Sequence, residues 1–513
     1  MTEPFSYDRV PYPSLTFPKT SPERLATQAA VNGLKAADPR NCRYLELGCG
    51  DGTNLLAHAY LYPESQFVGI DLSQTHIDSA NAALADLGIK NTVFRQMNVM
   101  DLKPGELNHF DYIVAHGLFS WVPEVVRQRV LDIYAEYLDS NGVGYLSYNT
   151  YPGCHVRTMF NEIMHFHVRK IDEPLEKIDS AVSMIKFIGD VTDADSTYQM
   201  MVREELEGMI DRTREGIYHD EFSEFNQPFY FYQFADMLAG RGMQYVSEAE
   251  EGVSNTGALS PEALGVLDSV APDLIEREQY LDFIRCRRFR STLFCRKDIE
   301  LDRNYLREHT DEFYFAGRLR YEEASSTIGS GEAETFFGPT SEKIKCNHPL
   351  TKAAIRYLSD RWTWSVRFDE LIRGSVEKYG LPVESRTESD VARTRDFMIE
   401  LFRVGMFRMR ITPSEGVAKG GSKPRVSSFA RWQVNSGSPT VMTLTGLSLE
   451  PDDEIARLLI ILADGTRERD ELVRGVIEKL EAPKGDQNEF RAMVRDRVDL
   501  NLEILGANGL LEA

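Results

Sequence analysis

The first 150 residues alternate between two patterns of hydrophobic and polar positions. Short runs rich in apolar, β-branched and aromatic residues predict five strands, at residues 42–47, 66–73, 92–102, 109–117 and 142–153. Between the runs, apolar residues recur at helical spacing, as Ile77, Ala80 and Leu84 do after the second strand. Strands that alternate with helices predict an α/β fold with an open parallel sheet, whose ligands bind beyond the carboxyl ends of the strands.

A glycine-rich turn, GCGDG, joins the first predicted strand to the following helix. Its glycines are Gly48, Gly50 and Gly52, and Glu46 precedes them. The dinucleotide fingerprint of dehydrogenases needs its third glycine at the position of Thr53. An acid inside the turn would repel a pyrophosphate, whereas it suits a ligand with cationic groups, such as the sulfonium and ammonium of S-adenosylmethionine. The turn therefore resembles the E-x-G-x-G-x-G motif of the class I methyltransferases.

Polar side chains stand at the ends of the next predicted strands. Asp71 ends the second strand, where a carboxylate can accept hydrogen bonds from both ribose hydroxyls. Asn98 ends the third strand, where its amide or the backbone of Val99 can bond the adenine edge. A glycine turn by itself could be a plain structural loop, but polar residues at successive strand ends favour a cofactor site. The predicted cofactor-binding residues are Glu46, Gly48, Cys49, Gly50, Gly52, Asp71, Leu72, Asn98, Val99, His116, Tyr7 and Tyr12.

Class I methyltransferases end in an antiparallel pair of strands after a helix, and the candidates for that pair come late in this chain. Residues 229–242 predict a helix with a glycine stop, and residues 243–250 and 287–297 predict the two strands. The resemblance thus implies a seven-stranded Rossmann-like sheet whose last pair is antiparallel. Two mostly helical insertions, residues 154–218 and 252–285, interrupt it.

The carboxyl-terminal part twice shows a helix-rich series typical of winged-helix domains. We expect these α+β units at residues 344–412 and 427–513, after a polar, glycine-bearing linker over residues 299–343. Their third helices are not strongly basic, which favours protein docking or dimerisation over DNA binding. The other expected parts are an N-terminal strap and helix (1–40), the cofactor-binding core (41–153), the helical insertion (154–218) and the end of the core (219–298).

The composition limits the class of protein and its partners. At 513 residues the chain is too long for one hydrophobic core. Its formal net charge of −22 disfavours nucleic acid as a partner. Its six cysteines include no C-x-x-C pair, which indicates reduced thiols. The N-terminus has no signal-peptide pattern and no apolar run is long enough to cross a bilayer, so we expect a cytoplasmic protein without membrane insertion.

Four longer segments resemble the bacterial methyltransferases that carry a methyltransferase regulatory domain. The segments are YDRVPYPSLTFPKTSPERLA (7–26), AHGLFSWVP (115–123), YNTYPGCH (148–155) and YHDEFSEFNQPFYFYQF (218–234). The resemblance covers at least residues 7–298, and the characterised members are rickettsial protein-lysine methyltransferases that act on a surface protein. It implies S-adenosylmethionine as the cofactor and methyl transfer onto protein lysines. Two positions depart from the family pattern, Ser21 in place of His and Cys154 in place of Trp, which concerns the shape of the substrate mouth.

Few residues are candidates for catalysis, because the methyl group of a sulfonium is already activated and the enzyme mainly positions the reactants. A lysine acceptor must lose a proton, since its reference pKa is about 10.4. The candidate catalytic residues are His116, Tyr148, Tyr151 and His219, and a structural role is a close alternative for both histidines. His165 and His167 lie two apart on a predicted helix, so they face different sides and do not indicate a metal site.

The segment before the core is pinned by prolines and carries Tyr7 and Tyr12. We expect it to fold over the cofactor with a tyrosine hydroxyl near the cofactor carboxylate, and a segment that merely packs on the core is an equal alternative. Three functions remain open: a protein-lysine methyltransferase, a methyltransferase of a small molecule or peptide precursor, and a cofactor-binding scaffold or sensor with little turnover. The insertions also allow a homodimer.

Overall fold

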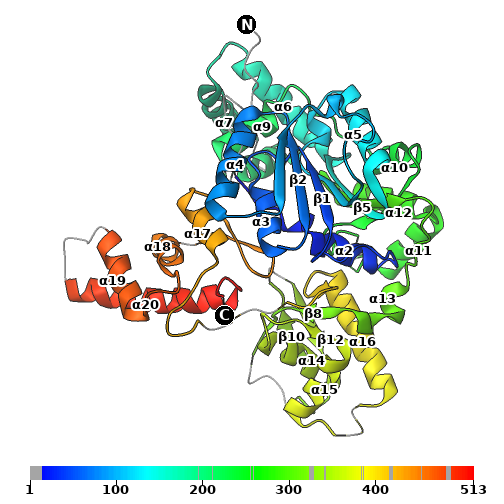
Figure 1. The fold of residues 1–513 in the computed structure, drawn as a ribbon. Coiled ribbons are helices and arrows are strands. Elements are labelled where there is room, and N and C mark those ends of the chain that lie inside the picture. The colour runs from blue at the N-terminus through cyan, green and yellow to red at the C-terminus, as the bar shows by residue number, and fades with distance from the viewer. Residues whose placement is uncertain are drawn as a thin grey trace.

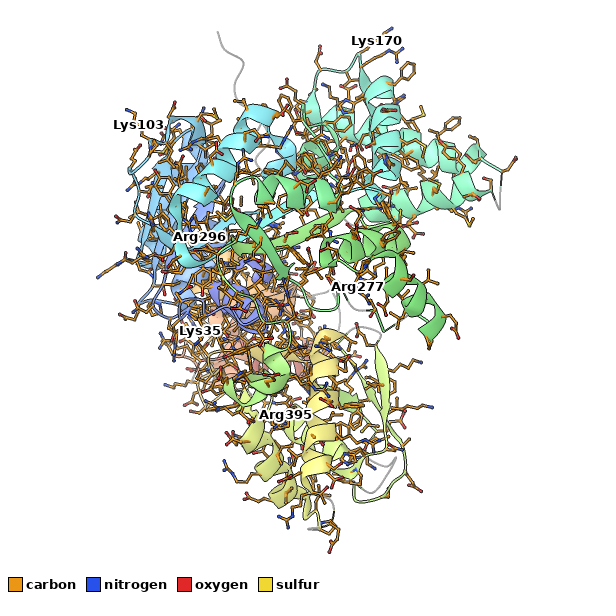
Figure 2. The ribbon with its side chains drawn as sticks, turned by 90° about the vertical axis from the view of Figure 1, so that its right-hand side faces the viewer. Lys35, Lys103, Lys170, Arg277, Arg296 and Arg395 are labelled. Carbon is orange, nitrogen blue, oxygen red and sulfur yellow. The ribbon has the colours of Figure 1, made fainter. Side chains whose placement is uncertain are left out.

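The computed structural model describes residues 14–193, 196–210, 212–254, 256–257, 259–322, 328–339, 342–382, 384, 386–414, 417, 420–451, 453–480 and 487–512. Figure 1 shows an α/β core with helical additions, a middle unit of helices and short strands, and a C-terminal, largely helical unit. The side view in Figure 2 places the helical addition that carries Lys170 and the middle unit that carries Arg395 at opposite ends of the molecule. The core lies between them.

The core is one seven-stranded sheet in the order β3-β2-β1-β4-β5-β7-β6. The strands are β1 (Arg43–Leu47), β2 (Gln66–Asp71), β3 (Thr92–Gln96), β4 (Phe110–Ala115), β5 (Leu138–Asn149), β6 (Met243–Glu248) and β7 (Phe289–Arg296). The first five run parallel, and β7 lies antiparallel between β5 and β6. The predicted Rossmann-like sheet with an antiparallel last pair is therefore confirmed.

Helices cover both faces of this sheet, because each buries one apolar stripe against it. They include α2 (Pro22–Ala30), α3 (Thr53–Leu61), α4 (Gln74–Leu87), α5 (Glu124–Tyr137) and α10 (Phe231–Ala239). The first three pack in one apolar cluster with Tyr44, and the last two pack on the opposite face with Leu146. Ser73 caps the start of α4 by accepting from the N–H of His76 at 3.2 Å, which leaves Asp71 at the exposed end of β2.

Two helical insertions separate β5 from β7. The helices are α6 (Gly153–Val168), α7 (Pro174–Val191), α8 (Thr197–Ile210) and α9 (Arg214–Glu221) in the first, and α11 (Pro261–Val270) and α12 (Leu274–Arg285) in the second. The first insertion has its own apolar core, which includes Phe160 and Ile185. On α6, His165 bonds the carbonyl of Glu221 and His167 bonds the hydroxyl of Ser180. Within the described ranges, no group of His, Cys, Asp or Glu side chains is arranged to hold a metal ion.

The predicted linker over residues 299–343 is wrong, because much of it forms regular structure. The elements that begin within this range are α13 (Tyr305–Glu308), η4 (Thr310–Glu312), β8 (Tyr314–Ala316), β9 (Arg320–Tyr321), β10 (Glu334–Phe337) and β11 (Lys343–Cys346). Two later strands pair with β8, namely β12 (Val366–Arg367) and β13 (Arg408–Arg410). β8 pairs with β12 and β13, and β9, β10 and β11 form a second sheet. The buried rings of Phe315 and Phe336 fix these strands, although small polar residues around them suggest a linker.

From residue 349 onward, the helices follow the predicted winged-helix order. The middle unit has α14 (Pro349–Asp360), α15 (Phe368–Tyr379) and α16 (Glu388–Arg403), and ends in β13. The C-terminal unit has α17 (Ser428–Asn435), β14 (Val441–Met442), β15 (Ser448–Leu449), α18 (Glu454–Leu462), α19 (Arg469–Lys479) and α20 (Gln487–Ala507). Of the helices that the structure describes, none combines the length and apolar character needed to span a membrane.

Candidate functional site

The glycine turn lies between β1 and α3, at the carboxyl ends of the parallel strands. The N–H groups of Gly48 and Cys49 donate to the carbonyl of Ile70 at 2.8 and 3.1 Å, so the turn rests against the end of β2. The N–H of Gly50 donates to Oδ2 of Asp71 at 2.9 Å. The fold therefore brings the turn and Asp71 together, as the sequence predicts.

Two glycines of the turn serve different purposes. Gly52 has a φ of +77°, and a Cβ there would lie 2.6 Å from the ring of Phe94 and 2.8 Å from the Cβ of Ala80. Gly50 has a φ of +54°, and a Cβ there would meet nothing within 4 Å. Gly52 is needed for the packing of the turn, whereas the space above Gly50 is open to a ligand.

Glu46 stands near the end of β1 with a buried carboxyl group. Nδ2 of Asn54 donates to its Oε1 at 2.8 Å, while its Oε2 is buried without a hydrogen-bond partner among the described residues. Burial raises the pKa of Glu46 to about 8; the Asn54 bond opposes this shift, and the carboxylates of Asp51 and Asp71 add to it. A cation bound beside Oε2 would satisfy this oxygen and favour the ionised form.

The end of β2 supplies a second acid. Asp71 accepts from the N–H groups of Gly50 and Ser73, each at 2.9 Å, which orients its carboxylate and leaves acceptor capacity on both oxygens. Leu72 follows with 46% of its surface exposed. After β3, the exposed Asn98 accepts from the N–H of Met100 at 3.0 Å, so its NH₂ group is the part left for a ligand. Val99, next in the chain, begins the short helix η2 (Val99–Asp101).

Residues 14–21, which precede the core in the chain and which we call the cofactor strap, contact this site. The N–H of Phe17 donates to Oδ1 of Asn54 at 2.8 Å, and the same amide holds Glu46. The ring of Phe17 lies 4.1 Å from that of His116. Phe17 and Asn54 are site residues that the sequence does not reveal, although Phe17 belongs to the proline-pinned segment already singled out. Tyr7 and Tyr12 lie outside the described residues, so their contact with the cofactor stays a prediction.

His116 follows β4 and lies against aromatic rings. Its Nδ1 is 2.8 Å from the hydroxyl of Tyr145, and its ring is 6.1 Å from that of Phe289. Burial and, to a smaller extent, the ammonium of Lys19 lower the pKa of His116 to about 3. The imidazole is therefore neutral at physiological pH and is a very weak base.

Tyr148, predicted to be catalytic, lies in the core instead. Its ring stacks on Phe234 with centroids 4.2 Å apart, and its hydroxyl is 3.2 Å from that of Thr292. Side chains alternate along a strand, so Tyr145 reaches His116 and Tyr148 faces away. The prediction for Tyr148 is therefore wrong.

The other two catalytic candidates lie on segments that follow β5 in the chain. Tyr151 is partly exposed after β5 and stacks on His155 with centroids 4.1 Å apart. His219 is buried on α9 in the helical insertion, with its ring 5.3 Å from that of Tyr218. No ring contact found among the described residues joins either of them to His116. Their catalytic roles remain predictions.

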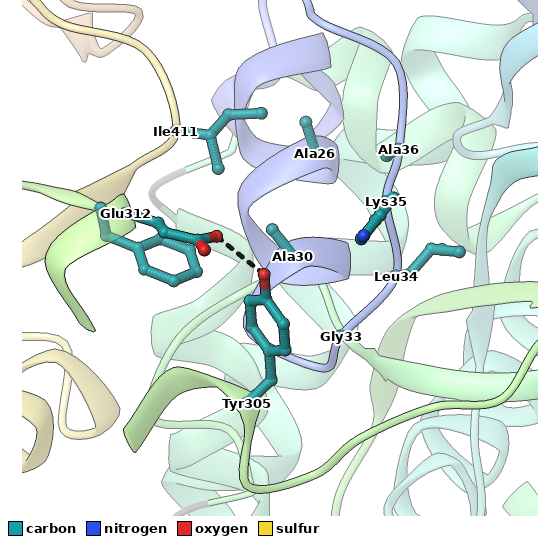
Figure 3. Close-up of a pocket in the computed structure, with 10 residues that line it drawn as sticks. Ala26, Ala30, Gly33, Leu34, Lys35, Ala36, Tyr305, Glu312 and Ile411 are labelled. Carbon is teal, nitrogen blue, oxygen red and sulfur yellow. Dashed lines mark hydrogen bonds between the residues drawn. The ribbon is translucent and has the colours of Figure 1, made fainter. Parts of the chain in front are cut away.

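A separate cavity of about 350 Å³ lies where α2 meets the middle unit (Figure 3). Small side chains such as Ala26 and Ala30 leave the space, and Tyr305 donates to Glu312 at 2.7 Å beside it. None of the predicted cofactor residues lines this cavity. The strand-end site, in contrast, can hold a ligand with a cationic group and a pair of vicinal hydroxyls, through Glu46 and Asp71.

Family models match three parts of the chain. The description "Methyltransferase domain" matches residues 45–143, and "Predicted methyltransferase regulatory domain" matches residues 213–296. The description "PKMT, C-terminal winged helix domain" matches residues 422–510. The last match agrees with the second predicted winged-helix unit.

Relatives and solved structures agree with these matches. RP789, an uncharacterised protein of Rickettsia prowazekii, is 34% identical over 371 residues, which are 71% of this chain and 67% of that protein. RP028 of the same organism is 35% identical over 236 residues, 46% of this chain and 94% of that protein. The structure of PKMT2 from Rickettsia typhi in complex with AdoHcy has a TM-score of 0.88 at 28% identity, and the match covers 98% of this chain and 100% of that one. The cofactor is therefore S-adenosylmethionine, and the chain belongs to the family of class I methyltransferases with a methyltransferase regulatory domain that resemble the rickettsial PKMTs.

Proposed function

We propose that this chain transfers methyl groups from S-adenosylmethionine to lysine side chains of a protein acceptor. The likeness to rickettsial PKMT2 over the length of both chains supports this acceptor. The observation that carries the proposal is a group of partly or fully exposed aromatic side chains, which we call the acceptor surface; one of them, Phe289, lies beside His116. A small acceptor needs an enclosed pocket, whereas a lysine on a protein needs an open rim.

The acceptor surface consists of Tyr151, Tyr230, Tyr232, Tyr280, Phe283 and Phe289. Phe289, 38% exposed, stands at the start of β7, and its ring is 6.1 Å from that of His116. β7 pairs there with the end of β5, which Tyr151 follows, and the ring of Tyr151 is 5.2 Å from that of Tyr230. Aromatic rings attract ammonium groups and are enriched where proteins contact one another.

The cofactor supplies a methyl group on a sulfonium, which needs no further activation. In the transfer a nitrogen–carbon bond forms, the carbon–sulfur bond breaks, and the lysine nitrogen ends with one proton fewer. His116, whose pKa is about 3, is too weak a base to take that proton. We assign His116 the role of a neutral wall and hydrogen-bonding group that positions the amine, while the proton leaves to solvent. Burial of the amine among the rings lowers its pKa and favours the reactive neutral form.

The cofactor residues have separate roles in this proposal. Oε2 of Glu46 would accept from the α-ammonium group, and Asp71 would accept from the ribose hydroxyls. Leu72 would pack on the adenine, and Asn98 and the backbone of Val99 would bond the adenine edge. The open space above Gly50 lets the cofactor approach the backbone of the turn.

The test is methylation of a lysate of the host organism with S-adenosyl-[methyl-³H]methionine. We expect label in protein bands, with methyl-lysine found by mass spectrometry, and no label with Asp71→Ala. Asp86→Ala, at an exposed carboxylate on α4, is the matched control and should label normally. Label confined to small molecules would contradict the protein acceptor. An unlabelled lysate with intact AdoHcy binding would favour a scaffold instead.

We also propose a homodimer through the first helical insertion. Its helices expose large apolar side chains that one chain leaves uncovered, namely Phe166, Phe187, Val191, Met200 and Ile210. Exposed apolar patches of this kind mark protein contacts. Light scattering should give twice the chain mass, and Phe166→Glu should reduce it to one chain. A wild-type protein of one chain mass would contradict this proposal.

A further inference from the structure

We propose that the two C-terminal units position the cofactor strap, so that contacts far from the glycine turn set the affinity for the cofactor. The strap bonds the cofactor site on one side and the C-terminal parts of the chain on the other. The inference concerns the S-adenosylmethionine site alone and does not depend on the identity of the acceptor.

On the cofactor side, one amide connects the strap to Glu46. Asn54 accepts from the N–H of Phe17 through Oδ1, while its Nδ2 is within hydrogen-bonding distance of the Thr20 hydroxyl at 3.1 Å and of Glu46 at 2.8 Å. The hydroxyl of Ser14 bonds the carboxylate of Asp51 in the glycine turn. A displaced strap would release Asn54, and the oriented carboxyl of Glu46 would lose its partner.

The C-terminal unit holds the first residues of the strap. The hydroxyl of Ser438, between α17 and β14, is 3.3 Å from the carbonyl of Ser14 and donates to the carbonyl of Thr440 at 2.8 Å. The hydroxyl of Thr16 is 3.5 Å from that of Ser448 at the start of β15. Both Thr16 and Ser438 are buried, so these polar contacts are partly shielded from water.

The end of the middle unit holds the other end of the strap. Ser21 caps α2, and Glu23 in its first turn is buried. Oε1 of Glu23 accepts from the backbone N–H groups of Ile411 and Thr412 at 2.8 and 3.2 Å, and Oε2 accepts from the Thr412 hydroxyl. The guanidinium of Arg410 lies 3.7 Å away. Arg410 ends β13, and Ile411 and Thr412 follow it, so α2 and the strap are bound to the middle unit through the carboxylate of Glu23.

Both ends of the strap are therefore fixed by parts of the chain that follow the methyltransferase core. A segment held in its bound conformation loses less conformational entropy when the cofactor binds beneath it. Such coupling is reciprocal, so the bound cofactor must in turn stabilise the contacts of Ser438 and Glu23. Both residues are positioning residues in this account, because they act through the strap.

The test measures AdoHcy binding to full-length variants by calorimetry. We expect Ser438→Ala to weaken binding about three- to tenfold and Glu23→Gln about tenfold, as loss of a hydrogen bond and of a charged acceptor implies. Ser436→Ala, an exposed serine near Ser438, and Glu64→Gln, an exposed glutamate, are matched controls and should bind as the wild type does.

Hydrogen exchange separates positioning from mere support of the fold. AdoHcy should slow exchange over residues 438–449 in the wild type and in the controls, and this protection should shrink in Ser438→Ala. If Glu23→Gln does not fold, Ser438→Ala still decides the question. A variant of Ser438 with a lower melting temperature but unchanged AdoHcy affinity and unchanged protection would overturn the inference.

Discussion

The buried carboxyl of Glu46 should couple cofactor binding to proton release. In the free protein its pKa is raised to about 8, chiefly by burial. At pH 7 about nine-tenths of the molecules therefore hold this group protonated. An ammonium group beside Oε2 favours the ionised form, so binding at pH 7 must expel the proton.

The size of the effect follows from the pKa shift. A shift from 4.5 to about 8 corresponds to about 5 kcal/mol against ionisation in the free protein. At pH 7 the remaining cost is one pKa unit, about 1.4 kcal/mol, which weakens binding about tenfold. The ligand carries a free amino-acid amine, which is already protonated at pH 7, so the net release is about 0.9 proton. Above pH 8 the release fades, because the carboxyl is already ionised in the free protein. Affinity should therefore rise with pH up to about pH 8.

Calorimetry of AdoHcy in buffers of different ionisation enthalpy counts the protons. Glu46→Gln keeps the shape of the side chain but cannot ionise, so release at pH 7 should disappear. Its affinity at pH 8 should fall about ten- to a hundredfold, since a hydrogen bond to a charged group contributes about 1.5–3 kcal/mol. Glu64→Gln, at an exposed position, serves as the control. Equal proton release in Glu46→Gln, or none in the wild type at pH 7, would refute the reasoning.

Four further outcomes are expected. Gly52→Ala places a methyl group 2.6 Å from an aromatic ring and should lower the free energy of unfolding, measured in urea, by about 2–4 kcal/mol. Gly50→Ala, at an open position with positive φ, should lower the free energy of unfolding by only about 1 kcal/mol but abolish AdoHcy binding. Tyr148→Phe loses only a buried hydroxyl contact, so methylation should stay within about twofold of wild type and a hundredfold loss would restore its catalytic role. His58 has its pKa lowered to about 3 by burial, so it stays neutral in the fold while the unfolded chain gains a proton below pH 6.5. Stability should thus fall as pH drops from 6.5 towards 3, by about 2 kcal/mol at pH 5 from this group, and urea titrations of His58→Gln should lack that slope. Lys19→Met should raise the midpoint of the pH–rate profile by about half to one unit, because it removes a positive charge near the methyl site.

The central core strands, such as β1 and β4, could be predicted because they are buried on both faces and form continuous apolar runs in the sequence. The strands of the middle unit could not be recognised in the same way. β8 has three residues and β12 has two, and their pairing joins segments about 50 residues apart. Such short strands carry little pattern of their own, since their stability comes from the partner strands and the helices that cover them.

The placement of the candidate cofactor residues was predictable because a strand, a turn and a helix position them locally. Glu46, the glycines and Asp71 need no knowledge of distant contacts. The roles of Tyr145 and Tyr148 could not be predicted in this way. Both lie on β5, but an odd separation along a strand puts them on opposite faces, and only the register of β5 tells which one reaches His116. Asn54 could not be found either, because its role depends on a strap that approaches from outside the core.

If the acceptor is a lysine, as proposed, the charges near His116 favour its neutral amine. The ammonium of Lys19 lies 5.1 Å from the centre of the Phe289 ring, and it also lowers the pKa of His116. Glu250, 3.6 Å from Lys19, offsets this charge only in part, because the carboxylate is half exposed. A positive charge that keeps His116 neutral also disfavours an ammonium group on the acceptor, and the rings add the cost of desolvation. In the proposed reaction, selection of the neutral amine takes the place of a catalytic base, so the rate should depend on how the strap and the acceptor surface hold the two reactants.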